Sequence, residues 1–177
     1  ENDADLVRRC LAGESECFTR LVERYERVLY NLALRMVGDE EDAKDIVQAS
    51  FVKTYEKLSS FAPRFKFFSW VYKITLNESL NALQRRKPME AIPENLPSEE
   101  RLPEDALDQE RLGRRIQIAL EHLTPDYRQV IVLRHFLELS YREMAEIIGV
   151  PEKTVKSRLF SARRTLCEIL SPEGGLR

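Results

Sequence analysis

The sequence predicts an all-α protein with two small helical domains joined by an acidic flexible linker. Apolar residues recur at intervals of three and four over most of the chain, which is the spacing of a buried helix face. Residues 88–110 contain four prolines, many carboxylates and no aromatic residue, so this run cannot bury enough apolar surface to order itself. Near the C-terminus only Gly149-Val150-Pro151 separates two helical patterns, as in a helix-turn-helix.

The first domain, predicted over residues 1–87, opens with a short helix. From residue 18 to residue 36, apolar side chains then keep the helical spacing for about five turns. Gly38-Asp39 ends this second helix, and Asp39 is able to cap a third one over residues 40–58.

Three polar residues of the third helix, Asp42, Asp45 and Gln48, are three residues apart and so share one edge. A solvated acidic face is the simpler interpretation, because the macrodipole favours carboxylates near a helix N-terminus. The alternative is a docking strip for a basic partner. Spacing alone favours the solvated face.

Residues 61–73 hold six aromatic residues interleaved with three cations. Such a segment suits unstacked bases, because each ring offers a stacking surface worth about 1–3 kcal/mol per base and the cations hold the backbone. A core of large rings is the competing interpretation, and Phe68, Val71 and Ile74 are expected to be core. The candidates for nucleic-acid contact lie nearer the loop: Phe61, Arg64, Phe65 and Lys66.

Charge is segregated along the chain although the net charge is only −2. Residues 64–87 carry a net +5 and residues 90–110 a net −7, and local charge of this kind informs about partners where the total does not. The basic end of the fourth helix, at Arg85-Arg86-Lys87, is favoured by the helix dipole and also suits phosphates. On the polar side of that helix, Asn77 can read a base edge or face water, and the residues leave both open.

The second domain, predicted over residues 111–170, consists of four short helices and is followed by a tail over residues 171–177. Thr124-Pro125 starts one of these helices, with proline in the first turn, where its missing N–H costs nothing. In the helix-turn-helix, Gly149 can take the left-handed conformation that ends a helix, and Pro151 is pre-set for the first turn of the next.

The last helix has an apolar face for the core and a basic outer face that suits a DNA groove. Lys156 can donate to guanine acceptors, the hydroxyls of Ser157 and Ser161 can donate or accept, and Phe160 can press on a thymine methyl. A solvated basic helix in a small bundle is the alternative, but the turn and the spacing favour DNA. The residues expected to pack inward are Val155, Leu159, Ala162 and Leu166.

Several classes of protein are excluded by what the sequence lacks. Three cysteines in helical patterns indicate reduced thiols in a cytoplasmic protein rather than a disulfide framework. There is no CxxC pair, no phosphate-binding glycine loop and no nucleophile beside either histidine, so we expect no metal, no cofactor and no enzyme activity. The chain has no signal-like start and no apolar run able to span a bilayer, so we expect no membrane insertion.

Three segments, in this order, resemble the bacterial extracytoplasmic-function sigma factors, the two-domain minimal class of RNA polymerase specificity subunits. They are DAKDIVQASFVKTYEKL at 42–58, FFSWVYKITLN at 67–77 and the run from ALEHLTPDYRQVIVLRHF to RRTL at 119–166. The resemblance covers nearly the whole chain. It implies that 1–87 is the region 2 domain, 111–170 is the region 4 domain, and the partners are core RNA polymerase, promoter DNA and an anti-sigma factor.

The resemblance also implies roles for individual residues and reverses the interpretation of the acidic edge. Asp42, Asp45 and Gln48 would bind the basic β′ clamp coiled coil, while other surfaces meet the β subunit. Flipped bases of the promoter −10 element would be trapped by the aromatic loop and the helix after it, and the −35 element would be read by the helix-turn-helix. The implied −10 residues are Phe61, Arg64, Phe65, Lys66, Trp70, Lys73, Asn77, Arg85 and Arg86. The implied −35 residues are Tyr141, Arg142, Thr154, Lys156, Ser157, Arg158, Phe160, Ser161, Arg163 and Arg164, with the last helix's arginines on phosphates.

Departures from the family bear on the melting loop and on the promoter sequence, not on the class. The family commonly has Phe-Arg-Gly where this chain has Phe61-Ala62-Pro63, a glycine in place of Lys153 and a basic residue in place of Ser161. The alternative function is a stand-alone helix-turn-helix regulator with a helical sensing domain. Such a regulator would bind duplex DNA by itself, usually as a dimer.

Overall fold

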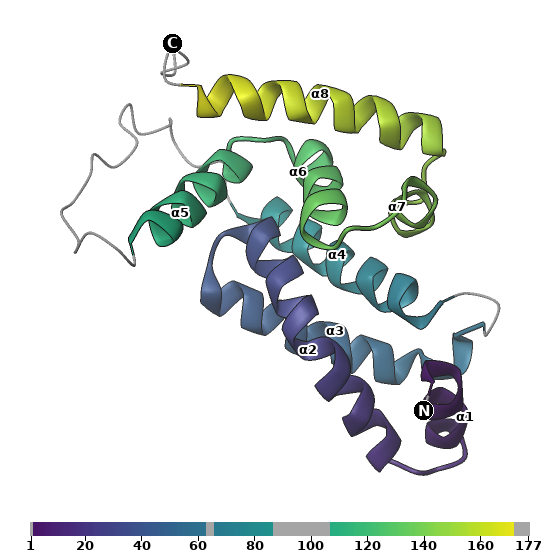
Figure 1. Ribbon diagram of the computed structural model, residues 1–177. Coiled ribbons are helices and arrows are strands. Elements are labelled where there is room, and N and C mark those ends of the chain that lie inside the picture. The colour runs from purple at the N-terminus through teal and green to yellow at the C-terminus, as the bar shows by residue number, and fades with distance from the viewer. Residues whose placement is uncertain (1, 63–65, 87–106, 172–177) are drawn as a thin grey trace.

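The computed structural model of the chain describes residues 2–62, 66–86 and 107–171, and these residues form helices with no strand. The all-α class predicted from the sequence is confirmed. Figure 1 shows two layers, with the helices of the N-terminal half below and those of the C-terminal half above, and α8 outermost. Residues 88–106 of the expected linker and 172–177 of the expected tail lie outside the described residues, and α5 begins at Leu107, inside the range assigned to the linker.

The N-terminal half is a bundle in which α2, α3 and α4 pack against one another and α1 packs on α2. Gly38 ends α2 with a φ of 76°, and the side chain of Asp39 accepts a hydrogen bond of 2.9 Å from the backbone N–H of Asp42, so the predicted stop and cap are confirmed. The elements are α1 (Asp3–Leu11), α2 (Glu16–Val37), α3 (Glu40–Glu56), the 3₁₀ turn η1 (Leu58–Ser60) and α4 (Phe67–Arg85).

The C-terminal half is held together by α8, which packs on α5, α6 and α7. Thr124 caps α6 with proline at the start of the helix, as predicted, and Gly149 ends α7 with a φ of 81°. Pro151 precedes the first turn of α8 as its N-cap rather than lying within it. The elements are α5 (Leu107–Glu121), α6 (Pro125–Ile131), the π-helical turn η2 (Val132–Phe136), α7 (Tyr141–Ile148) and α8 (Glu152–Leu170).

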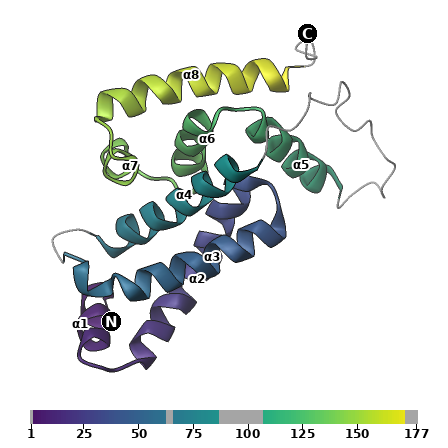
Figure 2. The ribbon, with the colours of Figure 1, turned by 180° about the vertical axis from the view of Figure 1, so that it is seen from behind.

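The two halves are in direct contact. α7 packs on α4, and α2 packs on α5, α6 and η2. Figures 1 and 2, which view the molecule from opposite sides, both place α7 beside α4. Surfaces predicted to have separate roles therefore lie against one another.

Candidate functional site

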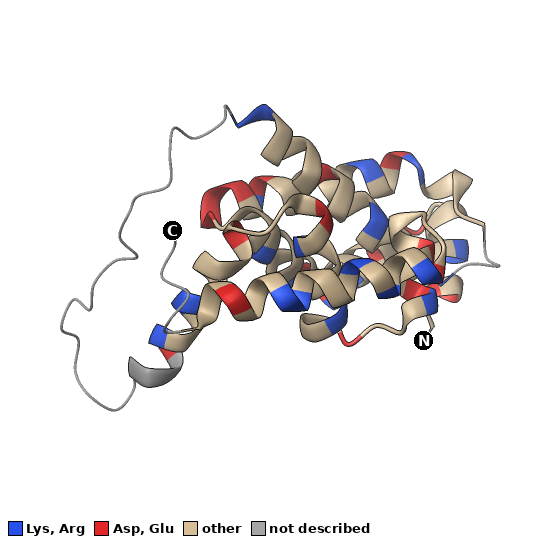
Figure 3. Ribbon diagram, turned by 90° about the horizontal axis from the view of Figure 1, so that it is seen from above, with Lys and Arg blue, Asp and Glu red and all other residues tan. Residues whose placement is uncertain are grey.

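The outer face of α8 is open to solvent. Val155, Leu159 and Ala162 are fully buried, as predicted from the helical spacing, whereas Leu166 of the same predicted set is only half-buried. Phe160 points the other way and is 73% exposed, a large fraction for an aromatic ring, and Lys156 and Ser157 are exposed beside it. Seen from above, Lys and Arg residues recur along α8 (Figure 3). The helix thus presents a basic face with an apolar ring at its centre.

Two side chains of α7, the aromatic Tyr141 and the basic Arg142, extend this face. The ammonium of Lys156 lies 5.4 Å from the ring centroid of Tyr141, and the guanidinium of Arg134 lies 5.2 Å from the same ring. Arg142 is exposed and pairs with Glu146 at 3.5 Å within α7. Thr154 and Ser161, by contrast, are half-buried.

The three arginines of α8 that the sequence suggested for phosphates differ in their surroundings. Arg158 is half-buried and pairs with Asp126 at the start of α6, at 3.1 Å. Arg163 is exposed, and its Nε donates to Nε2 of His135 at 3.2 Å; burial, then the charges of Arg163 and Arg134, lower the pKa of His135 and keep it a neutral acceptor. Arg164 is exposed and pairs with Glu168.

At the start of α4, aromatic rings pack into a core instead of facing solvent. Phe61 is 7% exposed, and its ring centroid lies 5.5 Å from that of Phe67 and 5.3 Å from that of Trp70. Phe61 was expected at the loop surface, but it is buried here. Val71 is core as expected, whereas Phe68 and Ile74 are only half-buried. Phe67 and Tyr72, which were not predicted to be core, are the buried rings of α4.

The polar residues implied for the −10 element occupy the solvent side of α4. Lys66, Lys73, Asn77 and Arg85 are exposed, Trp70 is half-buried, and Arg64 and Phe65 lie outside the described residues. The ammonium of Lys66 is already engaged, because it lies 2.9 Å from Oε1 of Glu143 on α7.

Glu143 makes two sets of contacts, neither of which was predicted from the sequence. It forms a capping box with Ser140, the pattern Ser-x-x-Glu that begins many helices, and it accepts from Lys66 of the other half. The hydrogen bond from Lys66, followed by those from Ser140, lowers the pKa of Glu143 to about 2. The pattern was visible in the sequence, but the contact with Lys66 was not.

The acidic edge of α3 runs between two grooves. Asp42 is half-buried, and Asp45 and Gln48 are exposed. A groove of about 970 Å³ between α2 and α3 is mainly apolar and includes Gln48, while a groove of about 460 Å³ between α3 and α4 includes Asp42 and Asp45. The apolar lining of the larger groove comprises Phe18, Val22, Tyr30, Val47, Phe51, Val52 and Tyr55.

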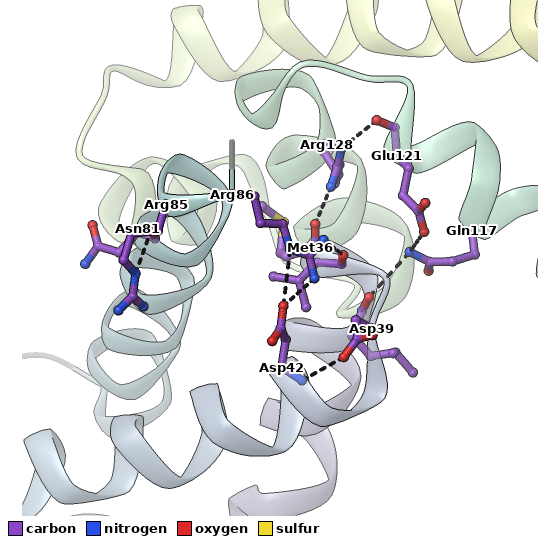
Figure 4. Close-up of polar contacts among 11 residues, drawn as sticks. Met36, Asp39, Asp42, Asn81, Arg85, Arg86, Gln117, Glu121 and Arg128 are labelled. Atoms are coloured by element: carbon purple, nitrogen blue, oxygen red, sulfur yellow. Dashed lines mark hydrogen bonds and ion pairs between the residues drawn. The ribbon is translucent and has the colours of Figure 1, made fainter. Parts of the chain in front are cut away.

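Arg86 joins two of the predicted sites. It was suggested for DNA, but its Nε donates to Oδ2 of Asp42 at 3.2 Å and its Nη1 donates to the carbonyl of Val37 at 2.6 Å (Figure 4). A residue suggested for the −10 element is therefore paired with one suggested for the polymerase.

The described part of the chain contains no group of three or more side chains placed to hold a metal ion. Among its helices, none combines the length and the apolar character that crossing a membrane requires.

Comparison with known proteins identifies the family of the chain. Residues 21–88 match the profile of Sigma-70 region 2, and residues 113–166 match the profile of Sigma-70, region 4. The chain is 31% identical to the ECF RNA polymerase sigma factor SigW of Bacillus subtilis, over 90% of this chain and 92% of SigW. It is 36% identical to the ECF RNA polymerase sigma-E factor of Escherichia coli, over 96% of this chain and 95% of that protein.

Solved structures agree with the sequence relatives. CnrH in complex with the cytosolic domain of CnrY matches with a TM-score of 0.76 and 27% identity, over 96% of this chain and 97% of CnrH. The sigma factor RpoE of Bartonella quintana, in complex with the anti-sigma factor NepR, matches with a TM-score of 0.68 and 25% identity, over 86% of this chain and 96% of RpoE. The chain therefore belongs to the extracytoplasmic-function sigma factors, the alternative sigma factors that direct RNA polymerase to its promoters.

Proposed function

We propose that this sigma factor uses three separate surfaces to bind polymerase, to read the −35 element and to open the −10 element. The acidic edge of α3 docks on the basic β′ clamp coiled coil of core polymerase, α8 reads the −35 element, and the start of α4 with the loop before it opens the −10 element. Residues 1–87 and 111–170 act as the two functional units. The observation that carries the proposal is the solvent-facing basic surface of α8, with Phe160 73% exposed at its centre.

The chemistry of the α3 edge supports docking. Asp45 and Gln48 project into solvent, so a basic partner can reach them without rearrangement of the bundle. The apolar groove beside Gln48 adds surface that water hydrates poorly, and a partner that fills it gains roughly 25 cal/mol per Å² of apolar area removed from water. Charge would give the contact its orientation, and the groove would give it much of its affinity.

The exposed face of α8 supports upstream-box reading. Lys156 and Ser157 have the donors that major-groove base edges accept, and Phe160 has the apolar surface that suits a thymine methyl. Arg142, Arg163 and Arg164 flank them with charges for phosphates, which fix the register of the helix. Thr154, Ser161, Tyr141 and Arg158 border this face.

The surface of α4 supports strand opening. Lys66, Lys73, Asn77 and Arg85 lie on its exposed side, and Trp70 stands at the border of the aromatic cluster. Phe61 supports Trp70 by ring contact, and Arg86 joins the set once it leaves Asp42. Flipping a base costs a few kcal/mol, which stacking and phosphate contacts in such a site can offset.

We further propose that the chain acts through its partners and is not itself an enzyme. CnrH and the Bartonella sigma factor were solved with CnrY and NepR. We propose that this chain also binds an anti-sigma factor, through the surfaces that face polymerase. The factor would work in the cytoplasm, where polymerase meets the chromosome, without a cofactor.

Run-off transcription with core polymerase tests the proposal. Promoter-specific product that requires the chain supports it, and tight binding to duplex DNA without polymerase, with no effect on transcription, supports a stand-alone regulator instead. Asp45→Arg reverses charge on the docking edge and is expected to weaken polymerase binding with an unchanged circular dichroism spectrum. Glu23→Arg, which reverses an exposed charge on α2 away from both grooves, is the matched control.

A further inference from the structure

The C-terminal end of α2 is where the two halves of the molecule are joined. The last carbonyls of a helix have no partner within it and need donors from elsewhere. Here the carbonyl of Val37 accepts from Arg86 of the same half, and the carbonyl of Met36 accepts from Nη1 of Arg128 on α6. Figure 4 shows both arginines converging on this helix end.

Arg128 holds a helix end in each half. It is only 5% exposed, and its Nη2 donates to the carbonyls of Glu121 at 2.7 Å and Leu123 at 3.3 Å, at the end of α5. Gln117 adds a second link, since its Nε2 donates to the carbonyl of Leu34 and its Oε1 accepts from Arg35. The contact between the halves is thus built on specific polar groups.

Two positive charges therefore meet at one helix end. Burial lowers the pKa of Arg128, the charge of Glu121 opposes that shift, and the charge of Arg86 adds to it. The helix dipole offsets about half a unit of positive charge at this end, less than the two guanidinium groups carry. The carboxylate that contacts Arg86 directly is Asp42, through Nε at 3.2 Å and through Nη2.

Asp42 also belongs to the edge proposed to dock on the polymerase. Its side chain is 45% exposed, so a basic group of a partner can reach it while Arg86 is still bound. An arriving cation would compete with Arg86 for the same oxygen atoms. Arg86 would then face the buried Arg128 without its carboxylate, and the two positive charges would repel each other.

We propose that Arg86 couples docking at Asp42 to separation of the two halves. The inference rests on the proposed docking role of Asp42. In the free chain, Asp42 allows Arg86 and Arg128 to share the end of α2, and the halves stay closed. When a basic group of the polymerase pairs with Asp42, the closed arrangement loses stability and the C-terminal half moves away from the N-terminal half.

Separation has a consequence for DNA. In the closed arrangement Glu143 forms an ion pair with Lys66, and α7 packs on part of α4. Opening frees Lys66 for phosphates and releases Arg86 toward the same surface. The −10 surface would thus become available when the chain is on the polymerase.

The test measures the distance between the halves of the full chain by single-molecule energy transfer. One dye is placed on Cys167, which is exposed on α8, and the other on a cysteine introduced at Glu23 of α2, in a Cys10→Ser background. The variants are Asp42→Asn, Arg86→Gln, the double variant and Asp42→Glu, which keeps the carboxylate. Glu41→Gln, which removes an exposed carboxylate paired with Lys44 on the same helix, is the matched control.

The wild-type chain, Asp42→Glu and Glu41→Gln are expected to be closed without polymerase and to open when core polymerase is added. Asp42→Asn should raise the open population by about two- to fivefold without polymerase, the effect of losing one accessible ion pair. Arg86→Gln in the same chain should restore closure, because the repelling charge is gone. A merely structural role for either residue predicts additive losses instead of this rescue.

Three results would overturn the coupling: a wild-type chain that is already open, an Asp42→Asn chain as closed as wild type, or a double variant as open as Asp42→Asn. Circular dichroism confirms that each variant is folded. Core-polymerase affinity is measured in parallel. If Asp42→Asn opens the chain, Arg86→Gln closes it, and polymerase binding is unchanged, the charge balance that keeps the halves closed is confirmed, but the docking role of Asp42 fails and with it the link to polymerase.

Discussion

The outer face of α8 and the exposed side of α4 are both basic helix surfaces proposed for DNA, but their surroundings differ. The α8 face is complete within the C-terminal half, and its central residues project into solvent. On α4, Lys66 is held by Glu143 of the other half, and the nearby rings are packed into a core. On the proposed assignment, reading paired DNA would need no rearrangement of the protein, whereas strand opening would need the halves to separate.

The largest expected effect is on the free energy of unfolding, and it distinguishes an aromatic residue of α4 from one of α8. Phe67→Ala should lower the free energy of unfolding by about 3–5 kcal/mol, because Phe67 is 4% exposed and its removal leaves a cavity among Tyr25, Phe61 and Trp70. Phe160→Ala should change it by less than about 0.5 kcal/mol. Urea denaturation measures both, and similar losses would show that the α8 ring is not a free surface.

A second prediction tests the α8 face alone. Lys156→Ala should lose about 1–3 kcal/mol of discrimination between the upstream box and scrambled DNA, because an amine on a base edge contributes only to the correct sequence. The measurement is holoenzyme binding to the two DNAs at one salt concentration. Arg164→Ala is the matched control and should weaken both complexes equally. An equal loss for Lys156→Ala would make it a phosphate contact.

A third prediction tests the covering of α4. Glu143→Gln keeps a residue able to form the capping box but removes the charge that holds Lys66, so the free chain should bind a single-stranded −10 oligonucleotide about two- to fivefold more tightly. Glu146→Gln, one turn along α7 and paired within that helix, should leave the affinity unchanged. Fluorescence anisotropy measures the three affinities. Equal affinity in the wild type, Glu143→Gln and Glu146→Gln would show that Glu143 does not restrict access to Lys66.

The smallest effect is a dependence on pH. The pKa of Glu143 is lowered from 4.5 to about 2 in the folded chain, so its charged form contributes stability above pH 4.5 and loses that contribution as the pH falls through 2. The difference in unfolding free energy between wild type and Glu143→Gln should therefore be constant from pH 7 to about 5 and shrink toward pH 2. A constant difference across the whole range would contradict the ion pair.

Local patterns predicted most of the helices and the solvent-facing side of α8. Spacings of three and four placed Val155, Leu159 and Ala162 inside and Phe160 outside, because a helix rotates each side chain by a fixed angle. The aromatic segment was harder, because its rings serve equally as core or as stacking surface. Phe67 is buried by Phe61, which precedes α4, and by Tyr25 of α2, and spacing within α4 cannot reveal either partner.

The sequence by itself determined the helical class, the stops at Gly38 and Gly149, the cap at Asp39 and the motifs of the family, since each depends on neighbours within a few residues. Only the tertiary structure brought Asp42 to Arg86, Arg128 to the end of α2 and Lys66 to Glu143. These pairs are 44, 92 and 77 residues apart in sequence. Periodicity fixes the direction of a side chain around its own helix, but packing between helices decides which charge it meets.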